Sequence, residues 1–430
     1  MTAADETKNT FMPKAIESCK SRKEQPFFIF ALSFLLSFRS LNYFINSLFA
    51  TGLHINFSFS PIFYGVAALL GIVSYFYICF KRDLLSVVLC SFALYGTLSF
   101  FVIYPSFIEA IYTSPLDLAY SPVNILFLYC LPVLNYFRLV KNKNSIVASM
   151  LPWSLAILVL SSLSYFVFSI GKAHNDAAYM LISYGMLPYS CLCFLYPCGG
   201  NSLFRRLAVK LISIASFFIV VLSGSRGAMV CSIVFFVLLL FYKRINGLRI
   251  LCFFLIVILA TLAFTRATFF LEPLNQILTA NGIYSRTIIK ALEGLLFNSS
   301  DRADLYSVLW NGALESPLFG HGLWGDRVLL NSAFSHNVFL EFLSSFGLFF
   351  GFALIVWLVV SLTKSLFELD GVLRPLLFSA IPYGFVSLFF SGSFLNNEWF
   401  FVLVGLFFLK DKALVEREFN TEWRPLIWKK

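Results

Sequence analysis

Two stretches of this chain hold side chains that can bind phosphate groups and move protons. The first is the sequence SGSRG at 223–227, and the second is the polar segment from about 265 to 340. Arginine binds phosphate oxygens through two parallel hydrogen bonds, and a neutral histidine can accept a proton near neutral pH. We therefore predict a site for a phosphate-bearing ligand whose reaction uses a general base. The candidate residues are Arg226, Arg266, Arg286, Lys290, Arg302, Arg327, His336, Asn337 and Glu341.

The SGSRG sequence indicates a tight turn followed by a helix. Its two glycines and two serines allow the chain to bend sharply and to expose backbone N–H groups. Arg226 then lies at the start of an apolar helix expected over 227–242, and a helix start favours anions. The simpler interpretation is a hairpin turn whose arginine reaches toward the membrane interface.

The polar segment has helical patterns of its own. Apolar residues recur at helical spacing over 284–297, and Asp301 can cap a second helix that ends before Pro317. We expect both helices to lie on the membrane surface as a lid. Arg302 falls in the first turn of the second helix, where a cation opposes the helix dipole. That position suggests an anionic partner, which a substrate, Asp301 or lipid headgroups could each supply.

His336 ends the polar segment, directly before an apolar helix expected over 337–362. We interpret it as the candidate base. Asn337 and Glu341 share one face of that helix, and Glu341 lies about one turn inside the membrane. A carboxylate in a membrane is costly, so Glu341 should be paired or functional, and pairing with an outer-face arginine is the simpler interpretation.

The cysteines and carboxylates do not indicate a metal centre. Nine cysteines fall mostly within apolar runs, and neither CxxC nor HExxH occurs. No DxD pair is present to hold a divalent ion for a nucleotide leaving group. A diphosphate leaving group would then be neutralised by arginines, the role that metal ions play elsewhere. We expect no metal and no other cofactor.

Composition places these residues in a membrane protein. The chain is 59% hydrophobic and 13% charged, whereas a soluble domain carries about 25% charged residues. Continuous apolar runs of roughly 20 residues recur from end to end, which favours spanning helices over a barrel. The expected fold is all-α and polytopic, with about twelve spans at 26–49, 60–80, 84–104, 122–140, 146–170, 178–197, 207–222, 227–242, 248–264, 337–362, 373–390 and 396–410.

The distribution of charge orients these helices. Of the 32 lysines and arginines, 24 fall at the two ends of the chain (1–25 and 410–430) and in alternate loops. The positive-inside rule makes that side cytoplasmic, so we expect both termini inside and the loop 265–336 on the outer face of the membrane. The net charge of +10 then reflects orientation and attraction to membrane lipids, and not binding of nucleic acid. Arg39 lies inside the first span, and its role is open.

Two strings carry a resemblance to a known superfamily. DRADLYSVLWNGALESPLFGHGLWGD at 301–326 and SHNVFLEFLSSFGLFFG at 335–351 resemble the O-antigen ligases and the Wzy-type O-antigen polymerases. The shared pattern is an arginine that opens a helix, a tryptophan within it, a Pro-Leu-x-Gly-x-Gly turn and a His-Asn-x-x-Leu-Glu helix start. SGSRGA at 223–228 matches the Ser-Arg-Gly turn of the superfamily, and the close resemblance covers about 210–360. His321 departs from the pattern, because a small apolar residue is commoner there.

The resemblance implies an integral glycosyltransferase of the GT-C type that uses a glycan linked to undecaprenyl diphosphate without a metal. The family arginines that match Arg226 and Arg302 are thought to hold the diphosphate. The family histidine that matches His336 is the proposed base for the acceptor hydroxyl, and the reaction would invert the anomeric centre. The other candidates (Arg266, Arg286, Lys290, Arg327, Asn337 and Glu341) are assigned to substrate binding by location alone.

Three functions are compatible with these features. The string SHNVFLEFLSSFG and the stretch 182–184 look more like a polymerase. A polymerase joins undecaprenyl-diphosphate-linked oligosaccharide repeats in the bacterial inner membrane, and a chain-length-regulating membrane protein is a conceivable partner. A ligase would instead transfer the polymer to lipid A–core. A carrier or flippase for an anionic lipid-linked substrate is the alternative from another class; Arg39 fits it best, but no internal repeat supports it.

Overall fold

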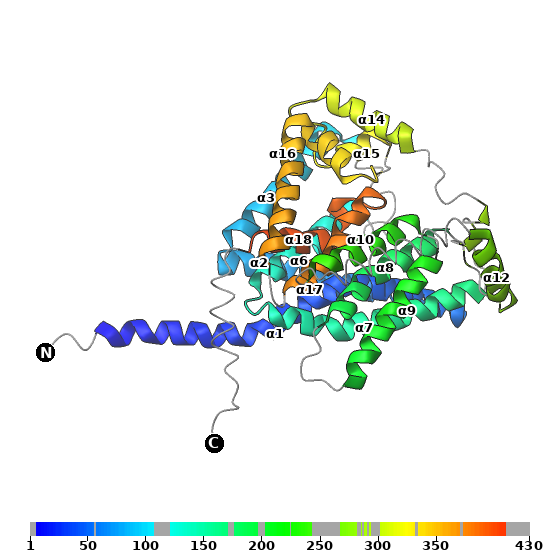
Figure 1. The fold of residues 1–430 in the computed structure, drawn as a ribbon. Helices are drawn as coiled ribbons and strands as arrows, with labels where there is room; N and C mark the ends of the chain where they lie inside the picture. Colours follow the sequence, from blue (N-terminus) through cyan, green and yellow to red (C-terminus); the bar gives the residue numbers. More distant parts are fainter. Residues whose placement is uncertain are drawn as a thin grey trace, which may run out of the picture.

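The computed structural model describes residues 6–55, 57–106, 121–170, 176–196, 203–223, 225–242, 267–281, 285, 288–289, 292–293, 302–331, 334–369 and 373–409. Within these ranges every regular element is a helix, as the continuous apolar runs predict. Figure 1 shows a bundle of helices, with α14 (Arg302–Glu315) and α15 (Gly325–Leu329) together at its top in this view.

The remaining helices follow the apolar runs of the sequence. The first half of the chain contains α1 (Glu6–Ser47), η1 (Leu48–Gly52), α2 (Ser60–Lys81), α3 (Leu84–Ile103), α5 (Pro122–Ile125), η3 (Leu126–Cys130), α6 (Leu131–Leu139), α7 (Asn144–Ile170), α8 (Asp176–Leu195) and α9 (Leu203–Leu222). The second half contains α10 (Arg226–Tyr242), α12 (Ala267–Ala280), α16 (Val338–Glu368), α17 (Leu373–Gly384), η4 (Val386–Phe389), η5 (Phe394–Asn396) and α18 (Glu398–Phe407).

Six described helices are long and apolar enough to cross a membrane, and four shorter apolar helices accompany them. The chain is therefore a polytopic membrane protein, as its composition predicts. The count of twelve spans stays a prediction. The span expected at 248–264, the tail 411–430 and most of the helix expected over 284–297 lie outside the described residues.

Of the helices described within the polar segment, the sequence predicts α14 but neither α12 nor the short α15. The predicted helix is α14, which begins at Arg302 and ends before Pro317 as expected. Its buried residues are Leu309, Gly312 and Ala313, so it packs by one face. No helix was predicted where α12 lies, and α12 contains Pro273.

The helix α16 is kinked where the loop after α14 crosses it. Gly347 has φ 78°, and a Cβ added there would fall 2.6 Å from the Pro317 carbonyl oxygen. Only glycine tolerates both the left-handed backbone and this close approach. The kink leaves the carbonyls of Ser344 and Ser345 to accept hydrogen bonds from the backbone N–H groups of His321 (2.8 Å) and Gly322 (3.0 Å). The loop is thereby fixed to α16.

The largest correction to the expected fold concerns the end of the chain. The span expected over 373–390 stops being α-helical at Gly384, and α18 begins only at Glu398. Residues 385–397 form two short 3₁₀ turns instead. A Cβ at Gly384 would lie 2.7 Å from the backbone of Trp399, so the two helices touch at this glycine. We call residues 385–397 the connecting segment.

Polar contacts join helix ends on the side of the bundle away from the connecting segment. Lys81, at the end of α2, pairs with Glu24 of α1, and Gln25 donates to the Leu139 carbonyl of α6. Arg374, at the start of α17, donates to the Phe241 carbonyl at the end of α10. These ends are on the side predicted to be cytoplasmic, and the assignment of that side to the cytoplasm stays a prediction.

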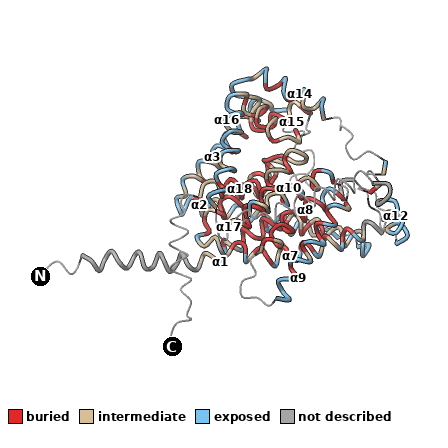
Figure 2. Tube along the Cα trace, in the orientation of Figure 1, coloured by how far each residue is buried: buried red, intermediate tan, exposed pale blue. Residues whose placement is uncertain are grey.

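The core is apolar and rich in aromatic rings. Phe28, Tyr136, Tyr189 and Trp399 are among the largest side chains with almost no exposed surface. Figure 2 shows that buried residues fill the centre of the bundle, while the ends and outer faces of α3, α14 and α16 are more exposed. A helix such as α3 with many exposed apolar side chains fits a lipid environment.

Candidate functional site

The connecting segment meets the starts of two helices at Phe390. Arg302, the first residue of α14, donates from Nη2 to the Phe390 carbonyl oxygen at 2.9 Å. Gly227, the second residue of α10, lies against the same residue: a Cβ there would be 2.6 Å from Cβ of Phe390 and 1.9 Å from Oη of Tyr184. Arg226 begins α10 and is exposed. The two predicted phosphate-binding arginines therefore lie at helix starts that share one neighbour.

His336 lies in the same region. Burial and the positive charge of Arg302 lower the pKa of His336 from its usual 6.5 to about 4. Its ring packs against Phe334, with ring centroids 4.2 Å apart. Its Nδ1 atom is buried and has no hydrogen-bond partner in the described part of the chain. Its backbone has φ 50°, which is rare for a residue with a side chain. His336 is thus a neutral imidazole at pH 7.

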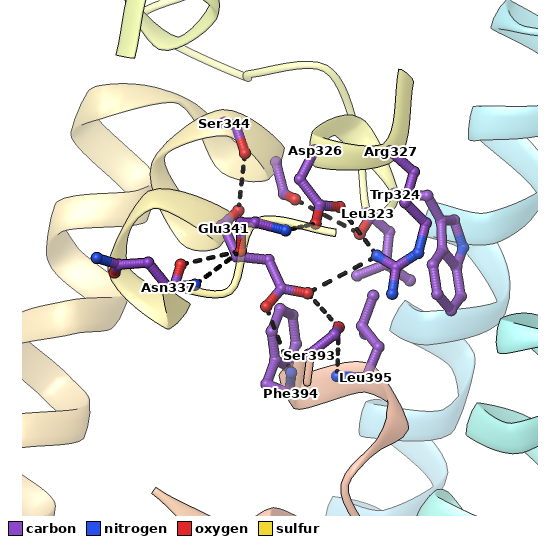
Figure 3. Close-up of polar contacts among 12 residues, drawn as sticks. Leu323, Trp324, Asp326, Arg327, Asn337, Glu341, Ser344, Ser393, Phe394 and Leu395 are labelled. Carbon is purple, nitrogen blue, oxygen red and sulfur yellow. Dashed lines mark hydrogen bonds and ion pairs between the residues drawn. The ribbon is translucent and has the colours of Figure 1, made fainter. Parts of the chain in front are cut away.

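Beside His336 lies a buried ionic cluster, drawn in Figure 3. Nη1 of Arg327 contacts Oδ1 of Asp326 at 2.9 Å and Oε1 of Glu341 at 3.8 Å. All three side chains are at most 3% exposed. The guanidinium group of Arg327 also lies over the Trp324 ring, 4.8 Å from its centroid. The predicted pairing of Glu341 with an arginine of the polar segment is therefore present.

Asn337 caps the helix that follows His336. Its side-chain oxygen accepts hydrogen bonds from the backbone N–H groups of Phe339 (3.0 Å) and Leu340 (3.4 Å), so it satisfies donors at the start of α16. Ser335 donates its hydroxyl to the Asn337 carbonyl oxygen at 3.0 Å. These contacts fix the backbone on both sides of His336.

His321 has a structural place that the resemblance did not indicate. Its Nε2 is 2.9 Å from the Gly312 carbonyl oxygen and its Nδ1 is 3.3 Å from Oη of Tyr104. Because a carbonyl oxygen can only accept, Nε2 carries a proton and donates it to the Gly312 carbonyl oxygen. His321 thereby joins α14 to the end of α3, which explains a polar residue in this turn.

The structure brings some of the predicted site residues together. Arg302 and His336 interact, and the turn that holds Arg226 contacts the same connecting segment. Arg327, Glu341 and Asn337 contact protein groups in this structure, so their predicted contact with substrate stays a prediction. Arg266, Arg286 and Lys290 lie outside the described residues.

Sequence reasoning missed the connecting segment and the residues that hold it. Ser393 donates its hydroxyl to Glu341, and the backbone N–H of Phe394 donates to Glu341 Oε2 at 3.4 Å. Arg39 donates to Glu398 at 3.0 Å and to the Asn396 carbonyl oxygen at 2.8 Å. Two residue types in the sequence could have indicated this segment. One is a glycine, Gly392, which has φ 88° in the structure, and the other is an asparagine, Asn397, which caps α18.

The described residues contain no group of three or more His, Cys, Asp or Glu side chains placed to hold a metal ion. The expectation of a metal-independent site stays a prediction. What the geometry offers is an exposed arginine at one helix start, a second arginine at another, and a neutral histidine beside it. Cations and backbone N–H groups at helix starts favour an anionic ligand.

The fold and this site define a polytopic membrane protein that has two arginines at helix starts and a histidine near one of them. Residues 211–356 match the model of the O-antigen ligase family, so the resemblance to the superfamily of O-antigen ligases and polymerases is confirmed over that segment. The match implies an enzyme of glycosyl transfer in the O-antigen and lipopolysaccharide pathways. No curated protein and no solved structure matches the chain.

Proposed function

We propose that the protein is an O-antigen polymerase. It transfers a growing glycan from undecaprenyl diphosphate to a sugar hydroxyl of the next lipid-linked repeat, at the periplasmic face. The observation that carries the proposal is the convergence of three residues from the matched segment. Arg226, Arg302 and His336 all lie within 211–356; α10 and α14 both reach Phe390 at their starts, and the charge of Arg302 acts on His336.

The proposed step is an inverting displacement at the anomeric carbon. The acceptor oxygen forms a bond to that carbon while the bond from the carbon to the diphosphate oxygen breaks, and the electron pair leaves with the diphosphate. His336 accepts the proton of the acceptor hydroxyl. Arg226 and Arg302 offset the charge that develops on the leaving diphosphate, so the step requires no metal ion.

The environment of His336 couples the base to the binding of donor. In the free protein, burial and Arg302 lower the pKa of His336 to about 4, which makes it neutral but weakly basic. A bound diphosphate places negative charge beside Arg302 and cancels part of its effect. The pKa of His336 then rises toward its usual value, and the base gains strength when donor is present.

The ligase is the second candidate, and a specific observation favours it. The matching family is described as O-antigen ligase. A ligase would use the same donor, the same arginines and the same base, with lipid A–core as acceptor. The features SHNVFLEFLSSFG and 182–184 favour the polymerase. The carrier is less favoured, because Arg39, its best feature, is paired with Glu398.

A deletion in the host separates these functions. Lipopolysaccharide from the deletion strain and from strains complemented with wild-type protein is run on a gel. Core with a single repeat, and a ladder restored by wild type, supports the polymerase. Bare core with accumulated lipid-linked polymer indicates the ligase. Full rescue by Arg226→Ala, Arg302→Ala and His336→Ala, each at normal membrane levels, contradicts both and favours the carrier.

A further inference from the structure

The buried ionic cluster contacts the backbone on both sides of the proposed site. Asp326 uses its two oxygens for different partners: Oδ1 accepts from Arg327 at 2.9 Å, and Oδ2 accepts from the backbone N–H of Ser335 at 3.1 Å. Ser335 directly precedes His336. Asp326 therefore fixes the chain at the proposed base, although it lies at 0% exposure and out of reach of a substrate.

Glu341 fixes the backbone on the other side of the proposed site in the same way. One of its oxygens accepts from the hydroxyl of Ser393 and the other from the backbone N–H of Phe394, at 3.4 Å. Ser393 lies three residues after Phe390, whose carbonyl oxygen holds the guanidinium group of Arg302. Glu341 therefore fixes the stretch of connecting segment that orients the proposed diphosphate-binding arginine.

Arg327 joins the two acids, since its Nη1 contacts both carboxylates. We propose that Asp326, Arg327 and Glu341 are positioning residues that set the distance between His336 and Arg302. The inference rests on the proposed function and assigns these residues a role that does not require contact with substrate. A network of this kind holds reacting groups in place, where small displacements cost large factors in rate.

Packing alone does not account for the arrangement. A buried ion pair is weak evidence for stability, because desolvation of the charges offsets their attraction. The chain offers a second Asp–Arg ion pair far from the site, whose side chains are 19% and 21% exposed. Asp83, in the turn between α2 and α3, accepts two hydrogen bonds from Arg138 of α6, at 2.7 and 2.8 Å. It has the same chemistry and lies on the side predicted to be cytoplasmic.

The test uses the full-length protein in lipid nanodiscs, with the variants Asp326→Asn, Glu341→Gln and Ser393→Ala and the control Asp83→Asn. An amide offers one acceptor oxygen where a carboxylate offers two, so each amide variant keeps an acceptor for only one of the two partners of the native carboxylate. Ser393→Ala is the milder variant in case Glu341→Gln folds poorly. The dissociation constant is measured for undecaprenyl diphosphate, kcat is measured with lipid-linked repeats extracted from the deletion strain, and backbone hydrogen exchange is measured at 334–337 and 390–394.

We expect the variants to separate the effect on binding from the effect on kcat. Glu341→Gln and Ser393→Ala raise the dissociation constant about tenfold, because a charge-assisted hydrogen bond of Arg302 is misplaced, and speed exchange only at 390–394. Asp326→Asn leaves binding within about twofold, lowers kcat about a hundredfold and speeds exchange only at 334–337. Asp83→Asn changes none of these. The cluster is only a packing element if the three variants alter binding and kcat together, or leave both unchanged.

Failure of the proposed function gives a different result. In that case His336→Ala and Arg302→Ala turn over like wild type, and no variant separates binding from kcat. The exchange measurement then still decides whether the cluster holds the two stretches of backbone. Unchanged exchange in Asp326→Asn and Glu341→Gln overturns the positioning role whatever the activity.

Discussion

Two helix connections in this protein differ in what their backbones do. The turn between α2 and α3 consists of two residues, Arg82 with φ 53° and Asp83, and it is fastened by the bond of Asp83 to Arg138. The connecting segment between α17 and α18 has thirteen residues, from 385 to 397, and it contacts Arg302, Glu341 and Arg39. The short turn only reverses the chain, whereas the long segment presents backbone groups to charged side chains.

This difference indicates where function lies. Backbone that lies outside a helix and away from water needs other partners for its N–H and C=O groups. Here three charged residues from three other helices supply some of these partners, and one of the three, Arg302, is a proposed substrate-binding residue. Charged side chains within a membrane protein's bundle are energetically costly, so their presence around this segment suggests a function. The predictions that follow test whether the two connections differ as their contacts suggest.

The largest effect is expected from Arg302→Ala. The variant removes the bond to Phe390 and a proposed contact to the diphosphate, so the glycan ladder on a gel should fall by about a hundredfold or more. Arg82→Ala, in the short turn, should keep the full ladder at equal membrane levels. An intact ladder in Arg302→Ala would remove the functional difference between the two connections.

Gly227→Ala tests the contact between α10 and the connecting segment. Its Cβ would fall 2.6 Å from Cβ of Phe390 and 1.9 Å from Oη of Tyr184, so one neighbour must move. We expect a severalfold loss of transfer, partly restored by Tyr184→Phe, which removes the clashing oxygen. Gly65→Ala is the control, because nothing lies within 4 Å of a Cβ there. Equal activity of both alanine variants would contradict the close approach.

The Arg39–Glu398 pair tests whether the far end of the connecting segment is structural. Glu398 is 5% exposed, so Arg39→Met leaves its charge buried without its partner, and thermal stability should fall. The double variant Arg39→Met/Glu398→Gln should be more stable than Arg39→Met alone and should retain transfer activity. Loss of activity in a stable double variant would instead assign Arg39 a functional role and strengthen the carrier interpretation.

The smallest effect is expected from pH. Burial and Arg302 lower the pKa of His336 to about 4, so the imidazole is already neutral throughout the range from about pH 5.5 to 8. As pH falls, kcat/KM should therefore decline only near pH 4, because kcat/KM reports the free enzyme. A decline centred near the usual histidine pKa of about 6.5 would show that His336 is not desolvated in this way. Arg302→Gln removes the positive charge that lowers the pKa of His336. As pH falls, its residual activity should therefore decline at a higher pH than that of wild type.

Much of the helical framework could be predicted because long apolar runs determine it. The expected spans 60–80, 84–104 and 227–242 differ from α2, α3 and α10 by one residue at most at either end. The helix α14 was also predictable, since it ends just before Pro317 as predicted, while its expected cap Asp301 lies outside the described residues. These features depend on local sequence, where hydropathy and capping are sufficient.

The connecting segment could not be predicted in the same way. Residues 385–390 are nearly as apolar as the helix before them, so hydropathy continues the span to 390. Its end at Gly384 depends on the backbone of Trp399, and its shape depends on Glu341 and Arg302, which are distant in the chain. For the same reason the sequence indicated Arg302 and His336 as site residues but not Asp326 or Ser393, whose roles exist only through tertiary contacts.

The most direct test of the central claim uses purified protein in nanodiscs with lipid-linked repeats as the only glycan. Wild type should join repeats into longer lipid-linked chains and release undecaprenyl diphosphate without added metal. His336→Ala should bind undecaprenyl diphosphate as wild type does but lose transfer by about a hundredfold or more. Equal transfer by a well-folded His336→Ala protein would contradict the assignment of His336 as the base.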